Sequence, residues 1–143
     1  MQMLTRMMFG LVMTGLVAGP ALAGRQVFDE GPGGQVRFMT PSSNIGCLYR
    51  PAGSGAGAPE DGGPQLSCDR QQPNFRRFTL SRSGKAVMTV NPSGSPCCGR
   101  TEILNTGNSW SLDGFVCTVR DGGLACKRGA HGFFISRKKT SVH

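Results

Sequence analysis

The chain alternates hydrophobic and polar residues over short runs that turn-forming residues separate. Residues 35–39 show the pattern, with Val36 and Phe38 on one face. Further strand candidates are 44–49, 75–80, 85–90 and 133–135, and order resumes at 65–68. No window keeps the helical period over three turns, whereas alternation bounded by Gly, Pro, Asn and Ser is typical of strands. The pattern predicts one small all-β domain over 35–143, an antiparallel barrel or sandwich stapled by disulfides.

The clearest hairpin lies near the end of the chain, around Asp121-Gly122. This dipeptide favours a two-residue hairpin turn, because both positions tolerate positive φ. With that turn, Cys117 faces Cys126 at a non-hydrogen-bonded position, where antiparallel strands approach most closely. Facing cysteines fall within disulfide range. The register therefore predicts a Cys117–Cys126 disulfide.

The first 23 residues read as a signal peptide. Arg6 precedes an apolar run from 7 to about 18, and a small-x-small pattern ends at Ala23. The run is shorter than the ~20 residues that a membrane span needs. No later stretch is apolar enough for a membrane helix. We expect cleavage after Ala23, no remaining membrane span, and export to the periplasm or the extracellular medium.

Three segments of the remaining chain lack strand patterns. Residues 24–34 are expected to form a flexible N-terminus. Residues 51–64, "PAGSGAGAPEDGGP", are rich in Gly, Ala and Pro, which predicts a mobile surface loop. Residues 91–98 contain two prolines and a glycine. Two adjacent cysteines are therefore predicted to lie on a loop.

All six cysteines follow the predicted signal peptide, at positions 47, 68, 97, 98, 117 and 126. An even count in a small exported chain is typical of disulfides, because an oxidising compartment lets them persist. The chain has no Cys-x-x-Cys pair and only two histidines. A zinc site of the finger type is therefore not predicted. No other metal site and no cofactor is predicted either.

The pairing of four cysteines stays open. If Cys47–Cys68 closes across the loop at 51–64, then Cys97–Cys98 follows by elimination once the hairpin disulfide has formed. The alternative bonds Cys47 and Cys68 each to one member of the adjacent pair. A redox role for that pair is a further interpretation, since strained disulfides are the more reducible ones.

The chain is basic, with 16 Lys and Arg against 8 Asp and Glu and a formal net charge of +8. Without Arg6 the balance is 15 against 8, or +7. Such a surface favours encounter with anions, including nucleic acid, phospholipid headgroups and acidic glycans. The alternative interpretation is that the charge only keeps an exported protein in solution.

Candidate site residues follow from this charge. The candidate anion contacts are Arg128, Arg137, Lys138, Lys139, Arg76 and Arg77. In the run Phe75 to Phe78, alternation places one ring and one arginine on each face. That arrangement makes a poor stacking surface for single-stranded nucleic acid. His131 lies between glycines and is the alternative candidate for a catalytic residue, as a general acid or base.

Several motifs of the mature chain resemble a family of small exported bacterial proteins classed as a domain of unknown function. The matching segments are Ser43-Asn44-Ile45-Gly46-Cys47, Cys68-Asp69, Gly107-x-x-Trp110, Gly114-Phe115-Val116-Cys117, Gly123-Leu124-Ala125-Cys126 and Ala130-His131-Gly132-Phe133-Phe134-Ile135-Ser136-Arg137. Ala130 stands where that family usually has glycine, and Val142-His143 where an aromatic is common. The resemblance implies export, disulfides and a compact β-rich domain, and it implies no activity.

The sequence thus favours a non-catalytic exported binding module. Its partner would be an anionic glycan, a lipid headgroup or another exported protein. One alternative is a small nuclease-like hydrolase that uses His131. Another is an inhibitor or effector of a second exported protein.

Overall fold

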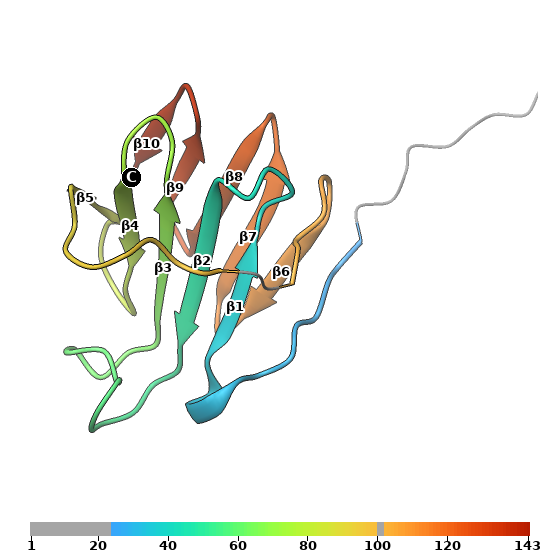
Figure 1. Cartoon of the computed structure of the whole chain (residues 1–143). Coiled ribbons are helices and arrows are strands. Elements are labelled where there is room, and N and C mark those ends of the chain that lie inside the picture. Colours follow the sequence, from blue (N-terminus) through green and yellow to red (C-terminus); the bar gives the residue numbers. More distant parts are fainter. Residues whose placement is uncertain (1–23, 100–101) are drawn as a thin grey trace, which may run out of the picture.

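The protein is a sandwich of two five-stranded antiparallel sheets (Figure 1). The computed structural model describes residues 24–99 and 102–143, so the predicted signal peptide lies outside the described residues. The first sheet contains β1 (Val36–Met39), β2 (Ile45–Arg50), β3 (Gln65–Arg70), β4 (Arg76–Leu80) and β5 (Val87–Val90). The second contains β6 (Ser109–Leu112), β7 (Phe115–Arg120), β8 (Gly123–Arg128), β9 (His131–Ser136) and β10 (Thr140–Val142).

In each sheet the strands follow one another in chain order. The sheets stay open, so of the two predicted architectures the sandwich is the one formed. The all-β prediction is confirmed. The only helical element among the described residues is one short 3-10 turn, η1 (Pro32–Gly34), and no described helix has the length and apolar character to cross a membrane.

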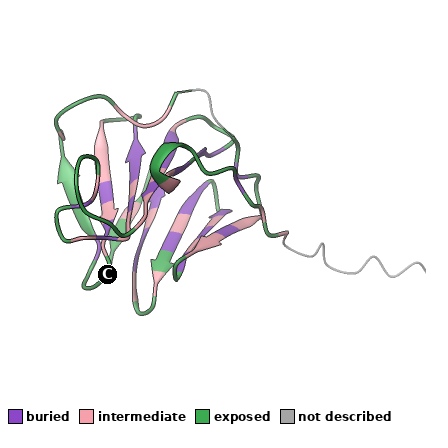
Figure 2. Ribbon diagram, turned by 90° about the horizontal axis from the view of Figure 1, so that it is seen from below, coloured by how far each residue is buried: buried purple, intermediate pink, exposed green. Residues whose placement is uncertain are grey.

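Alternation along the strands separates a buried face from an outer face. In β2, the side chains of Cys47 and Tyr49 are buried between the sheets, whereas Leu48 and Arg50 lie on the outer face and are half-buried. This is the consequence of the two-residue period of a strand. Viewed from below, the buried residues gather where the two sheets face each other (Figure 2).

Aromatic rings connect the two sheets through the core. Phe38 of the first sheet lies 5.1 Å from Trp110 of the second, and Phe78 lies 5.6 Å from Phe133, measured between ring centroids. Tyr49 contacts Trp110 edge-on at 5.8 Å. Such pairs contribute about 0.5–1.5 kcal/mol each beyond the burial of their area.

Two disulfides lie inside this core. Cys47–Cys68 joins β2 to β3, and Cys117–Cys126 joins β7 to β8. The sulfur atoms of Cys47, Cys68 and Cys126 all lie within 4.8 Å of one another, so the two bonds pack together between the sheets. The hairpin prediction is confirmed, with Cys117 facing Cys126 and positive φ at the two turn residues.

The remaining pair, Cys97–Cys98, forms the third disulfide, and no cysteine is free. The sequence left two pairings open for these four cysteines, and the structure contains Cys47–Cys68 together with Cys97–Cys98. These adjacent cysteines lie in the segment 91–99, which we call the strap. The strap crosses the outer face of the first sheet (Figure 1).

The segment 24–34 is attached to the sandwich. The Gln26 amide donates to the Ser109 carbonyl at 2.8 Å, and the Phe28 ring stacks on Phe38 at 5.4 Å. The flexibility of this segment stays a prediction. Residues 51–64 form the loop between β2 and β3, as expected, and their mobility stays a prediction.

Candidate functional site

The candidate basic residues fall into three places. Four of the six lie at one end of the sandwich: Arg76, Arg137, Lys138 and Lys139. There the β3–β4 and β9–β10 turns lie side by side (Figure 1), joined where Arg70 Nη1 donates to the Ser136 carbonyl at 3.0 Å. We call Arg70, Arg76, Arg137, Lys138 and Lys139 the turn end.

Arg70 is the residue of the turn end that sequence reasoning missed. It follows Leu66 and Cys68 on the buried face of β3 and is only 5% exposed. Its Nη2 donates to Asn74 Oδ1 at 2.7 Å, and its Nε has no described hydrogen-bond partner. Burial, and then the charge of Arg76, lower the pKa of Arg70 below its ordinary value. The sequence did contain a signal for this residue, because Arg70 is a charged residue at a strand position whose side chain points into the core.

Arg76 faces Arg70 directly across the β3–β4 pair. Its Nε donates to the same Asn74 Oδ1, at 3.1 Å. Like charges placed opposite each other on neighbouring strands destabilise a sheet. A carboxylate at this position would neutralise the two guanidinium groups, but the acceptor that they share is the neutral amide of Asn74.

The basic turn between β9 and β10 is held by its own hydrogen bonds. The Lys139 amide donates to Ser136 Oγ at 2.9 Å, and the Ser136 amide donates to the Lys139 carbonyl at 2.7 Å. Arg137, Lys138 and Lys139 are all exposed. Their backbone is thus ordered by this turn while their charged side chains face solvent.

No carboxylate pairs with the turn end among the described residues. The ion pairs of the described chain are Arg77–Asp69, Arg82–Asp61 and Arg120–Asp121. None of them includes a residue of the turn end. The turn end thus combines one buried arginine with four further cations, and no described carboxylate forms an ion pair with any of them.

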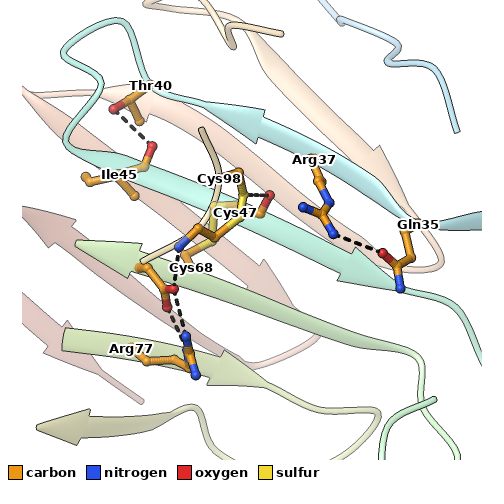
Figure 3. Close-up of a disulfide and its surroundings, with 10 residues drawn as sticks. Gln35, Arg37, Thr40, Ile45, Cys47, Cys68, Arg77 and Cys98 are labelled. Carbon is orange, nitrogen blue, oxygen red and sulfur yellow. Dashed lines mark hydrogen bonds and ion pairs between the residues drawn. A yellow bond between two sulfur atoms is a disulfide. The ribbon is translucent and has the colours of Figure 1, made fainter. Parts of the chain in front are cut away.

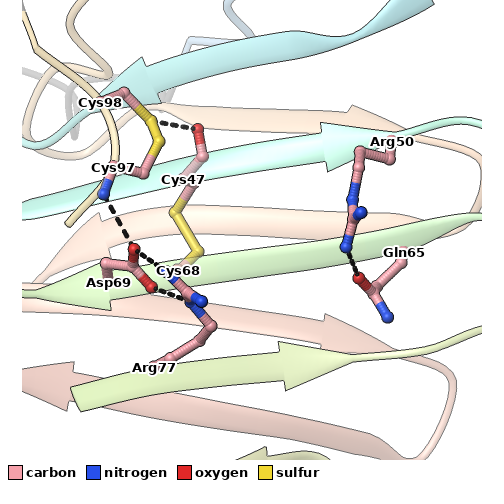
Figure 4. Close-up of polar contacts among 8 residues, drawn as sticks. All are labelled: Cys47, Arg50, Gln65, Cys68, Asp69, Arg77, Cys97 and Cys98. Carbon is pink, nitrogen blue, oxygen red and sulfur yellow. Dashed lines mark hydrogen bonds and ion pairs between the residues drawn. A yellow bond between two sulfur atoms is a disulfide. The ribbon is translucent and has the colours of Figure 1, made fainter. Parts of the chain in front are cut away.

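Arg77 lies on the outer face of the first sheet and is engaged within the protein. Its Nε and Nη2 donate to the two carboxylate oxygens of Asp69 at 2.8 and 2.9 Å. Asp69 is 1% exposed, and its Oδ2 also accepts the amide of Cys97 at 2.8 Å (Figure 4). Hydrogen bonding to Asp69 raises the pKa of Arg77. This pair therefore anchors the strap to the sheet.

Arg128 lies apart from the turn end, at the far end of β8. Its guanidinium sits 4.9 Å above the Phe115 ring, and it faces His131 across the β8–β9 pair. The side chain of His131 is half-buried and makes no hydrogen bond or ion pair with any residue in the described ranges. General acid–base catalysis needs a partner of matched geometry. The hydrolase hypothesis at His131 stays a prediction.

A groove of about 560 Å³ runs across the outer face of the first sheet, beside the strap. Its floor is a row of cross-strand neighbours, Arg37, Leu48, Ser67 and Thr79. One side is formed by Arg50 and Gln65, whose side chains are hydrogen bonded to each other (Figure 4). The strap, including Cys97 and Cys98, forms the other side.

The strap lies close against the sheet at this point. Sγ of Cys98 is 3.2 Å from the carbonyl oxygen of Cys47 (Figure 3). A Cβ atom added at Gly46 would lie 2.7 Å from the Cys97 carbonyl carbon and 2.8 Å from the Cys98 nitrogen. Glycine at this position is thus what allows the strap to approach the strand.

Three cysteine sulfurs, those of Cys47, Cys68 and Cys126, are the one cluster of metal-ligand type among the described residues. All three are bonded in disulfides, so they offer no thiolate. Metal ligation by cysteine requires the thiolate. We therefore interpret these three sulfur atoms as part of the packed core.

No family model matches the chain, and neither a curated protein sequence nor a solved structure matches it significantly. The resemblance drawn from the sequence motifs therefore stays a prediction. The turn end and the groove are the features of the described chain that point to a function.

Proposed function

We propose that this protein is an exported, non-catalytic binding module whose turn end holds an anionic partner. The observation that carries the proposal is Arg70, a buried cation that shares a neutral oxygen with Arg76 and has no carboxylate partner in the described chain. Burial of a charge without a counter-charge is costly. An oxyanion held by the exposed cations beside Arg70 would offset part of that cost through its charge.

The arrangement favours a partner with several anionic groups. Arg137, Lys138 and Lys139 extend the positive charge from Arg70 and Arg76 onto an exposed turn. Clustered sulfate, carboxylate or phosphate groups, as on an acidic glycan or a sheet of lipid headgroups, would meet several of these cations at once. Arginine forks suit bidentate pairing with such oxyanions.

Export is part of the proposal. Disulfides persist in oxidising compartments outside the cytoplasm, and this chain has three. Intact-mass measurement of the secreted protein tests it, with cleavage after Ala23 and no free thiol as the expected result. Retention of the first 23 residues in the exported product would contradict the signal-peptide prediction.

The binding proposal is tested by charge reversal at the turn end. We expect Arg137→Glu/Lys138→Glu to weaken binding to dextran sulfate or to phosphatidylglycerol vesicles by about tenfold or more at low salt. The matched control is Lys85→Glu/Lys127→Glu, which removes the same charge from two exposed residues elsewhere. Preference for one probe separates a glycan from a lipid surface.

If the turn-end variant and the control variant lose binding affinity to the same extent, net charge alone governs binding. That result would overturn the turn end as a site. Retention of binding in the turn-end variant would overturn it as well.

A further inference from the structure

The groove beside the strap has features of a second, separate binding site. Its volume, about 560 Å³, lies within the range of small-molecule sites. It is built on a strand surface that the Cys47–Cys68 disulfide stiffens from beneath. It does not include any residue of the turn end.

The charges around the groove are mostly positive. Arg37, Arg50 and Arg77 line it from β1, β2 and β4, and Asp69 is its one lining carboxylate. The carboxylate of Asp69 already accepts hydrogen bonds from Arg77 and from the Cys97 amide. Arg50 donates to the neutral Gln65 side chain and forms no ion pair with a described residue. The groove therefore offers the guanidinium of Arg50 to an oxyanion, in a setting where positive charge prevails.

The rest of the lining combines hydrogen-bonding and apolar groups. Ser67, Thr79 and Ser95 contribute hydroxyls, which both donate and accept. Leu48 and Pro96 contribute apolar surface at the floor and along the strap. A ligand suited to this lining carries hydroxyl groups, C–H faces and at least one oxyanion.

We propose that the groove binds an anionic sugar, a polyhydroxylated ring that carries a carboxylate or a phosphate. Arg50 pairs with the oxyanion, while the hydroxyls of Ser67 and Thr79 bond the sugar hydroxyls. Leu48 and the strap contact the C–H face of the ring. The bidentate geometry of a guanidinium fits both oxyanions, so the two sources share one recognition chemistry.

The test is calorimetric titration of the full chain, with its disulfides intact, against three probes. These are a galacturonic acid trisaccharide, a hexose phosphate and the neutral maltotriose. We expect saturable binding of at least one anionic probe and none of maltotriose. The preferred anionic probe identifies the carboxylated or the phosphorylated source.

Variants assign the binding to the groove. Arg50→Gln should weaken it about tenfold, as expected for one charged hydrogen bond, and Arg50→Lys by less. Ser67→Leu fills the floor from an outer-face position and should abolish binding without touching the core. The turn-end variant Arg137→Glu/Lys138→Glu should leave sugar binding by the groove unchanged. A negative result for the groove can therefore be distinguished from a negative result for anion binding at the turn end.

Absence of binding by both anionic probes would overturn the proposal. So would equal binding of maltotriose, or loss of binding in the turn-end variant with retention in Arg50→Gln and Ser67→Leu.

Discussion

Arg70 and Arg76 stand opposite each other on neighbouring strands and donate to one oxygen atom, Oδ1 of Asn74. The arrangement brings two positive charges together over a neutral acceptor. A protein optimised for stability alone would gain from a carboxylate at this position. Among the described residues no carboxylate pairs with either arginine, and this supports the proposal that the turn end binds an anion.

Replacement of Asn74 by Asp tests that argument. The new carboxylate would accept from both guanidinium groups, so we expect the free energy of unfolding at neutral pH to rise by about 1–3 kcal/mol. The same change should weaken binding of dextran sulfate or phosphatidylglycerol vesicles, because the carboxylate competes with the ligand. Chemical denaturation and binding titration of one preparation measure both effects.

Asn74→Ala provides the control for this experiment. It removes the shared acceptor without adding charge, so we expect lower stability and retained anion binding. Stabilisation by Asn74→Asp with unchanged affinity would show that the charges of Arg70 and Arg76 do not contribute to ligand binding.

We predict that substitution of Asp69 destabilises the protein more than substitution of any other acidic residue in the described chain. Asp69→Asn leaves Arg77 without its carboxylate and weakens the anchor of the strap at Cys97. Breaking a fully buried pair by removal of one partner costs about 3–5 kcal/mol. The Arg77 side chain is 31% exposed and can be hydrated, so we expect a loss below that range but above that of an exposed pair. Denaturant unfolding measures the loss.

Asp121→Asn is the matched control for Asp69→Asn. It breaks the ion pair with Arg120, in which the Asp121 side chain is 74% exposed. Exposed pairs contribute about 0–1 kcal/mol, so little change is expected. Similar losses in the two variants would contradict the structural role assigned to Asp69.

The three disulfides are predicted to differ in accessibility. Cys47, Cys68 and Cys117 are fully buried, whereas Cys97 and Cys98 are half-buried on the outer face. Mild reduction of the folded protein should therefore label the adjacent pair first, as alkylation and peptide mapping would show. Labelling of the core cysteines at the same rate would mean that the sandwich opens during the reaction.

Removal of these disulfides should also have unequal effects on stability. Cys47 and Cys68 are 21 residues apart, and closing a loop of that size contributes about 3 kcal/mol on the chain-entropy model. Cys97 and Cys98 are adjacent and close no loop. Double replacement by Ser should therefore cost at least about 3 kcal/mol at the first pair, where it also buries two hydroxyl groups in the core, and much less at the second. Denaturant unfolding measures both losses. A larger loss at the second pair would show that the strap contributes to global stability.

Much of the sandwich was predictable because its signals are local. Two-residue alternation located most strands, and the Asp121-Gly122 turn fixed the register that pairs Cys117 with Cys126. The edge strands β6 and β10 were not predicted as strands. They are short, three or four residues each, which leaves little alternation to detect.

The candidate site was only partly predictable because it depends on which turns meet. The basic run at 137–139 was visible in the sequence. Its neighbour Arg70 was not, since the contact with Ser136 joins strands of different sheets. The groove was likewise hidden, because the strap that forms its side folds back over β2 and β3 from a distant part of the chain.

Tyr49 provides a pH test of the core, since it is the single tyrosine of the chain. Burial raises the pKa of its phenol, and the hydrogen bond that it donates to Asp113 raises it further. A group whose pKa is raised on folding adds stability that is complete below its unfolded value, about 10, and is lost as the pH rises above it. We therefore expect phenolate absorbance to appear only together with alkaline unfolding. Asp113→Asn should lower the pKa of Tyr49 while leaving it above the ordinary value, because burial remains. Titration of Tyr49 near pH 10 in the folded protein would contradict its position between the sheets.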